Sequence, residues 1–129
     1  MMTLIRNAKQ VLILCCLFFL LSFTSFIKVS AKDINWTVVA KTINEVQFID
    51  VDSINYDKRG FLSVITKYSE INPDDQTIIQ SNSYLMAIDC KNRLFTQLPV
   101  NGNLNQVKNW DKPNNDKLIK TTIINSCSY

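Results

Sequence analysis

An apolar segment near the amino terminus limits how much of this 129-residue chain can take part in a fold. The segment Val11–Phe23 is apolar at every position but one, and the only charges before it are Arg6 and Lys9. A positively charged start followed by an apolar run is typical of a secretory signal peptide. The small-residue pattern Val29-Ser30-Ala31 is one that signal peptidase reads, so we expect cleavage before Lys32.

An uncleaved membrane anchor is the alternative for this segment. The stretch Val11–Ile27 has 17 residues, at the lower limit of the about 17 to 25 that a spanning helix needs. A lipid anchor is not expected, because Cys15 and Cys16 follow Leu14 and lack the small residues that precede a lipid-modified cysteine. Removing 31 of the 129 residues leaves 98, at positions 32–129, which is enough for one small domain.

The mature domain carries almost no net charge by count. The whole sequence has 14 Lys and Arg against 11 Asp and Glu. Three of the basic residues, Arg6, Lys9 and Lys28, lie in the signal segment, and every acidic residue lies after it, so 11 basic groups balance 11 acidic ones. A nucleic-acid partner is therefore not expected, and we expect membrane contact only through the signal segment if it is uncleaved.

Two cysteines, Cys90 and Cys127, remain in the mature domain. An even number of cysteines in an exported chain favours a disulfide, with two free thiols as the alternative. In the chain-entropy model, closing a loop of this length stabilises a domain by about 4 kcal/mol. That is a large part of the roughly 5 to 15 kcal/mol that holds a whole domain folded.

Runs of β-branched and aromatic residues predict a meander of strands. The expected strands are Trp36–Lys41, Val46–Ile54, Phe61–Tyr68, Thr77–Asp89 (one strand, or two with a break near Ser81–Ser83) and Arg93–Leu98. The segments Asn55–Gly60, Glu70–Asp75 and Lys91-Asn92 are rich in turn residues and separate them.

The last part of the chain is harder to assign. Residues 99–115 are polar and rich in asparagine, and we expect irregular structure there. After them, Ile119, Ile123 and Cys127 recur at helical spacing, whereas the β-branched run 121–124 intrinsically prefers a strand. Periodicity alone favours a helix only slightly.

Several short motifs follow one another in an order that resembles the surface-adhesin protein E-like family. They are Trp36, Phe48-Ile49-Asp50 with Ser53-Ile54, Tyr68, Ile88-Asp89-Cys90 with Arg93, Trp110 before Pro113, and Cys127. The resemblance implies an α+β fold, in which an antiparallel sheet of about five to six strands carries a C-terminal helix tethered by a Cys90–Cys127 disulfide. The namesake of the family is a lipid-anchored outer-membrane adhesin for host matrix and serum glycoproteins such as vitronectin and laminin. This chain departs from it in having no visible lipid-attachment motif.

The sequence offers little for catalysis. It contains no histidine, which excludes Ser-His-Asp and Cys-His nucleophile systems and most zinc sites. We expect Asp50 and Asp52 to share one face of a strand as water-facing carboxylates, an arrangement that cannot oppose two carboxyls across a cleft. Asp57 extends the series, but Ile54 and Asn55 do not fit a calcium loop. We therefore predict no enzyme activity, no cofactor and no metal.

Basic residues and a tryptophan are the candidate contact residues, with solvated surface as the alternative. They are Lys58, Arg59, Lys91, Arg93 and Trp110. We expect the aromatic residues Trp36, Tyr68, Phe95 and Trp110 to serve mainly in the core and its cover. The predicted function is non-catalytic, adhesin-like binding to a protein or glycan partner, such as an extracellular matrix component, by a protein that is periplasmic, outer-membrane-associated or secreted. The alternative is a periplasmic inhibitor or accessory protein acting on a cell-wall enzyme.

Overall fold

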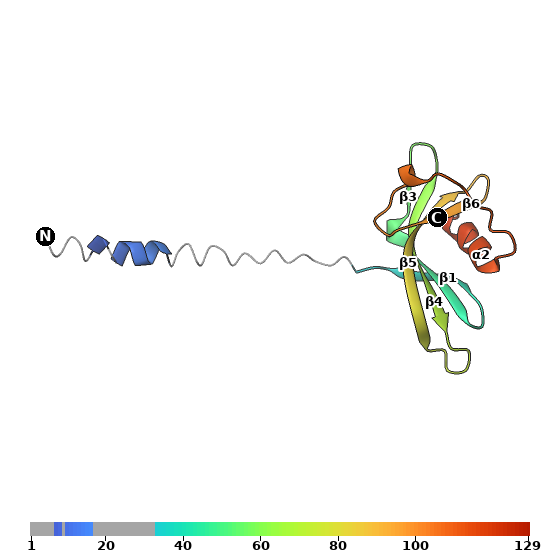
Figure 1. Cartoon of the computed structure of the whole chain (residues 1–129), viewed down its shortest axis with the longest axis horizontal. Coiled ribbons are helices and arrows are strands. Elements are labelled where there is room, and N and C mark those ends of the chain that lie inside the picture. The colour runs from blue at the N-terminus through green and yellow to red at the C-terminus, as the bar shows by residue number, and fades with distance from the viewer. Residues whose placement is uncertain (1–6, 9, 17–32) are drawn as a thin grey trace. The chain divides into compact units, whose positions relative to one another are not determined.

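The computed structural model describes residues 7, 8, 10–16 and 33–129 (Figure 1). Residues 10–16 are helical, and no helix of the described part is long and apolar enough to cross a membrane. The predicted cleavage site, Val29-Ser30-Ala31 before Lys32, lies outside the described residues. Asp33–Tyr129 forms a compact unit that contains the whole core cluster described below, so we expect it to fold by itself.

Within Asp33–Tyr129, six strands form one antiparallel sheet (Figure 1). The strands are β1 (Trp36–Lys41), β2 (Glu45–Asp50), β3 (Asn55–Tyr56), β4 (Leu62–Ile71), β5 (Ile78–Asp89) and β6 (Leu94–Leu98). Their order is β1-β2-β4-β5-β6, and β3 pairs separately with β4. The predicted meander of antiparallel strands is confirmed.

Three predicted boundaries were wrong. The second strand ends at Asp50 and not at Ile54, because the Asp50 side chain accepts from the backbone N–H of Asp52 and begins a 3-10 turn, η1 (Val51–Ser53). The predicted turn Asn55–Gly60 starts with two residues that pair with β4 as strand β3. Strand β4 continues to Ile71, into the predicted loop.

The long strand β5 is continuous, which decides between the two arrangements expected for it. Its exposed first half pairs with β4, residue for residue, from Ser81 opposite Ser69 to Ser83 opposite Lys67. The hydroxyls of Ser69 and Ser81 also share a hydrogen bond of 2.6 Å. The polar residues at the expected break therefore do not interrupt the strand.

The C-terminal segment is helix α2 (Lys117–Ser126), as the family resemblance implied. Asp116 caps it, because its carboxylate accepts from the backbone N–H of Ile119 at 2.9 Å. Leu118, Ile119, Thr122, Ile123 and Ser126 form its buried stripe. The helix covers one face of the sheet, and Ile119 and Ile123 complete a core whose sheet residues are Ile49, Leu62, Val64, Met86 and Ile88.

Two further links hold the helix against the sheet. A disulfide joins Cys90, which follows β5, to Cys127, which caps the end of α2, and this confirms the predicted pairing. At the other edge, Nδ2 of Asn125 donates to the carbonyl oxygen of Val39 at 2.6 Å. Val39 lies at the β-bulge of β1, where the pairing with β2 shifts register. The helix is thus attached to β1 and to the end of β5.

The segment that follows β6 lies against part of the opposite face of the sheet, where residues 102–105 adjoin Ser63 of β4 and Leu85 of β5. This segment contains a 3-10 turn, η2 (Leu104–Gln106), with Leu104 buried. It also returns to the sheet through an isolated bridge between Phe95 and Asp111. Residues 99–115 are otherwise irregular, as predicted.

Candidate functional site

The turn between β3 and β4 holds two of the predicted contact residues, Lys58 and Arg59. Asp57 organises this turn, since its Oδ1 accepts from the backbone N–H of Arg59 at 2.9 Å and from that of Phe61 at 3.0 Å. Gly60 closes the turn with a φ of 85°, a left-handed conformation that glycine adopts at little cost. Lys58 is exposed at the tip.

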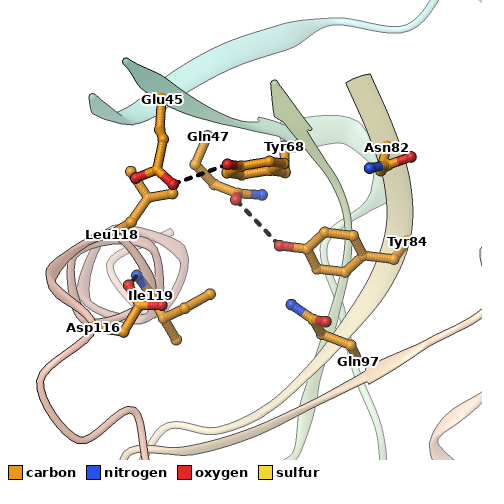
Figure 2. Close-up of a pocket in the computed structure, with 9 residues that line it drawn as sticks. All are labelled: Glu45, Gln47, Tyr68, Asn82, Tyr84, Gln97, Asp116, Leu118 and Ile119. Atoms are coloured by element: carbon orange, nitrogen blue, oxygen red, sulfur yellow. Dashed lines mark hydrogen bonds between the residues drawn. The ribbon is translucent and has the colours of Figure 1, made fainter. Parts of the chain in front are cut away.

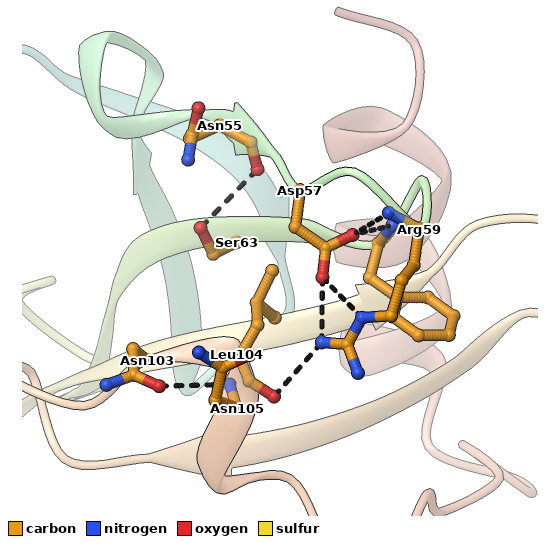
Figure 3. A network of polar contacts seen from close by, with 8 residues as sticks. Asn55, Asp57, Arg59, Ser63, Asn103, Leu104 and Asn105 are labelled. Atoms are coloured by element: carbon orange, nitrogen blue, oxygen red, sulfur yellow. Dashed lines mark hydrogen bonds and ion pairs between the residues drawn. The ribbon is translucent and has the colours of Figure 1, made fainter.

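Arg59 has a structural role that its sequence context did not indicate. Its guanidinium donates to Asp57 Oδ2 at 2.8 Å through Nε and forms an ion pair with the same oxygen at 2.7 Å through Nη2 (Figure 3). Nη2 also donates to the carbonyl oxygen of Leu104 at 3.5 Å, which links this turn to η2. About half of the Arg59 side chain, 53%, remains exposed, so the same group both stabilises the turn and faces solvent.

The hydrogen bonds around Asp57 favour the charged form of its carboxyl. Partial desolvation raises its pKa, but the hydrogen bonds from the Arg59 side chain and from the backbone N–H groups of Phe61 and Arg59 outweigh that effect. The net result is a pKa below the usual 3.8. Asp57 therefore neutralises part of the Arg59 charge at neutral pH, which leaves Lys58 as the more available cation of this turn.

The predicted contact residue Trp110 is placed beside the same turn. The ring centroids of Trp110 and Phe61 are 4.9 Å apart and tilted by 49°. The guanidinium of Arg59 lies over the Phe61 ring, 5.0 Å from its centroid. Trp110 is half-buried and is positioned by the neighbouring Asp111, whose backbone exchanges two hydrogen bonds with Phe95.

The turn between β5 and β6 holds the other two basic residues, Lys91 and Arg93. The carboxylate of Asp89 shapes it by accepting from the backbone N–H of Asn92 at 3.1 Å and from its side-chain amide at 2.7 Å. Lys91 and Arg93 are both exposed. Arg93 has a φ of 55°, a left-handed conformation that costs a residue with a Cβ about 1 to 2 kcal/mol. Gln76 and Asn114 also have positive φ, at 59° and 45°, so this conformation is not confined to the basic residues.

The two turns lie at the same end of the sheet. Leu62, at the start of β4, pairs with Ile88 near the end of β5, and Leu94 of β6 pairs with Asp89. The structure therefore brings the predicted contact residues together at what we call the basic end: Lys58, Arg59, Lys91, Arg93 and Trp110. A small hollow of about 130 Å³ adjoins Arg93 and is lined also by Pro113, Lys120, Ile123 and Ile124.

The remaining residues identified from the sequence cap a turn, lie in it or pack against the sheet. Asp50 is buried, with 6% exposed, and not water-facing as predicted, because it caps η1. Asp52 lies in that 3-10 turn and not on a strand. On the face away from α2, Lys67 places its Nζ 4.6 Å from the Trp36 ring centroid and 4.5 Å from that of Phe48, which gives these rings a packing role.

Comparison with known proteins gives one match. A family model described as the surface adhesin-E family matches residues 37–129, which include the whole sheet except its first residue, helix α2 and both bonded cysteines. No curated protein and no solved structure matches the chain.

Proposed function

The chain belongs to the surface adhesin-E family, and from that premise we propose that it binds a host protein or glycan through the basic end. Membership indicates an adhesin-like surface or exported protein with a non-enzymatic role that binds host partners. The proposal adds the contact surface and the class of ligand, with matrix or serum glycoproteins as the partners to test first.

The single observation that carries the proposal is the gathering of exposed cations from two separate turns. Lys58 comes from the β3–β4 turn, whereas Lys91 and Arg93 come from the β5–β6 turn. The half-buried Trp110, which packs on Phe61, and the hollow beside Arg93 add apolar surface next to each turn. Exposed cations beside aromatic and apolar surface suit a protein partner with an acidic rim, since electrostatic complementarity speeds and orients association.

Binding to immobilised vitronectin and laminin, measured by biolayer interferometry with residues 32–129, tests the proposal. The informative variant carries Lys58→Glu, Lys91→Glu and Arg93→Glu together. Arg59 is left unchanged, because removing it would leave Asp57 without its partner and disturb the turn. We expect the variant to bind roughly 10-fold or more weakly, and added salt to weaken the unmodified domain in the same way.

The matched control is Lys41→Glu, which reverses an exposed charge at the end of β1, far from both turns in the register of the sheet. It should bind like the unmodified domain. Equal binding by the triple variant would remove the basic end from the proposal. Capture of a cell-wall enzyme, with no binding to matrix proteins, would favour the inhibitor or accessory role instead.

We also propose that residues 1–31 are a signal peptide, so that the domain acts outside the cytoplasm. The charged start, the apolar run and Val29-Ser30-Ala31 support this. Amino-terminal sequencing of the exported protein should begin at Lys32. An intact Met1 in the membrane fraction would show an uncleaved anchor.

A further inference from the structure

A second cavity lies on the face of the sheet that α2 covers, in the half away from the basic end. It is under the start of helix α2 (Figure 2). Its volume is about 360 Å³, within the roughly 300 to 1,000 Å³ of small-molecule sites. Side chains of β2, β4, β5, β6 and α2 line it: Glu45, Gln47, Tyr68, Asn82, Tyr84, Gln97, Asp116, Leu118 and Ile119. It shares none of these residues with the basic end.

Two phenols are fixed in this cavity by hydrogen bonds to neighbouring side chains. The hydroxyl of Tyr68 donates to Glu45 Oε1 at 2.9 Å, and that of Tyr84 donates to Gln47 Oε1 at 3.1 Å (Figure 2). Each hydroxyl oxygen has used its proton in these bonds but can still accept one from a ligand. The cavity thus presents two oriented acceptors beside two carboxylates, those of Glu45 and Asp116.

Gln47 provides the independent sign of a ligand. Its side chain is completely buried, and Nε2 has no acceptor among residues 33–129 of the described structure. Buried polar groups in folded proteins are almost always paired, so a buried amide donor without a partner calls for an explanation. Ile49, two residues along the same strand, faces the same side as an apolar core residue. The Oε1 atom of Gln47 already accepts from Tyr84, and an acceptor that a ligand brings would pair its Nε2 as well.

The charges and donors of the cavity select the class of ligand. Glu45 and Asp116 disfavour an anion, and within the described residues no Lys or Arg lines the cavity. An ammonium group would suit the carboxylates but has no lone pair for Gln47 Nε2. A hydroxyl group can donate to a carboxylate or phenol and accept from the amide. We propose that this cavity binds one uncharged, hydroxyl-rich sugar residue, with Gln47 Nε2 as a donor and Glu45 and Asp116 as acceptors.

Access to the donor requires a side chain to move. Gln47 Nε2 is covered, and Tyr68 lies directly opposite Gln47 on the neighbouring strand β4 (Figure 2). Tyr68 is only half-buried, so its ring can shift toward solvent when its hydrogen bond to Glu45 breaks. The sugar hydroxyl then enters between the two phenols. The apolar side chains of Leu118 and Ile119 contact the C–H groups of the sugar ring.

Titration of ¹⁵N-labelled residues 32–129 with D-galactose, D-glucose and N-acetyl-D-glucosamine, followed by NMR, tests the proposal. At least one sugar should shift the side-chain amide signals of Gln47 at millimolar concentration, whereas n-butylammonium should not. Gln47→Leu removes the donor and should reduce the affinity at least 10-fold. Shifts caused by butylammonium alone, or by no probe, would overturn the proposal.

Two further variants separate folding and the basic end from the cavity. Asp116→Asn keeps a side chain that caps helices well and removes the carboxylate, so it should fold normally and bind the sugar at least 10-fold more weakly. The triple charge reversal at the basic end should leave sugar binding unchanged. If the triple variant binds matrix proteins normally and the sugar still binds the cavity, the sugar site stands although the basic end is not the contact surface. Loss of sugar binding in the triple variant would overturn the sugar site.

Discussion

The phenol of Tyr68 donates its proton to the carboxylate of Glu45 across the β2–β4 pairing, over 2.9 Å. That hydrogen bond is the main cause that raises the pKa of Tyr68 from 10.0 to about 12, with desolvation and the charge of Glu45 adding to it. The folded state therefore holds this proton to higher pH than the unfolded chain does. Stability from this pair is complete below pH 10 and is lost as the pH rises from 10 toward 12.

Replacing Glu45 by Gln should bring the pKa of Tyr68 back toward its ordinary value, because a neutral amide is a weaker acceptor for the phenol than a carboxylate and does not repel the tyrosinate. Tyrosinate absorbance during a pH titration measures this, with Tyr68→Phe as the variant that identifies the signal. Urea unfolding should show a smaller loss of stability above pH 10 in Tyr68→Phe than in the unmodified domain. Identical pH profiles in the two proteins would contradict the role of this pair.

Loss of the Cys90–Cys127 disulfide should lower the melting temperature by on the order of 20 °C. The bond closes a loop with a sequence separation of 37 residues, and the chain-entropy model assigns about 4 kcal/mol to a loop of this size. Circular dichroism of Cys90→Ala with Cys127→Ala, compared with the unmodified domain, measures the effect. Ser128→Ala, next to the bond, is the control and should melt normally. A melting temperature that is unchanged by reductant would contradict this prediction.

Neighbouring isoleucines of helix α2 should differ sharply in their contribution to stability. Ile123 is 2% exposed and packs in the core, whereas Ile124 is 55% exposed. Ile123→Ala should reduce the free energy of unfolding by roughly 2 to 5 kcal/mol, and Ile124→Ala by less than about 0.5 kcal/mol. Urea denaturation of the two variants provides the comparison. Similar losses for both would mean that the helix does not present this stripe to the sheet.

Arg93→Gly should stabilise the domain and weaken its binding at the same time. The left-handed φ of 55° suits glycine, so the change should add roughly 1 kcal/mol to the free energy of unfolding. Arg93→Ala removes the same charge and keeps a Cβ, so it should weaken binding without that gain. Equal stability of the two variants, measured by urea denaturation, would show that the backbone at Arg93 is not strained.

The fold was predictable where strand residues alternate strictly between two environments. In β4, Leu62, Val64 and Thr66 are buried and the residues between them are half-buried, which is the period of two that a strand with one covered face has. Helix α2 was ambiguous by periodicity, although the sequence held a further signal in Asp116, a strong N-cap residue. The end of β2 was misplaced because the cap made by Asp50 interrupts a run of strand-forming residues.

The sites were predictable to different degrees. Basic residues in turns are visible as such in the sequence, and the register of the sheet then brings the two turns together. The cavity under α2 was missed, because Gln47 and Tyr84 are polar residues on strands and nothing local shows which face a distant helix will cover. The structural use of Arg59 was also hidden, since its link to Leu104 joins residues 45 positions apart.

The hydrogen bond from Asn125 to Val39 joins two positions 86 residues apart, and this separation sets an order of events during synthesis. The ribosome releases β1 long before it releases α2. At about 5 to 20 residues per second, roughly 4 to 17 s pass before the helix can cover the apolar face of the sheet. Throughout that interval the strands already made lack helix α2, whose Ile119 and Ile123 complete their core, so their apolar residues gain their final packing partner only when residues 117–126 have been made.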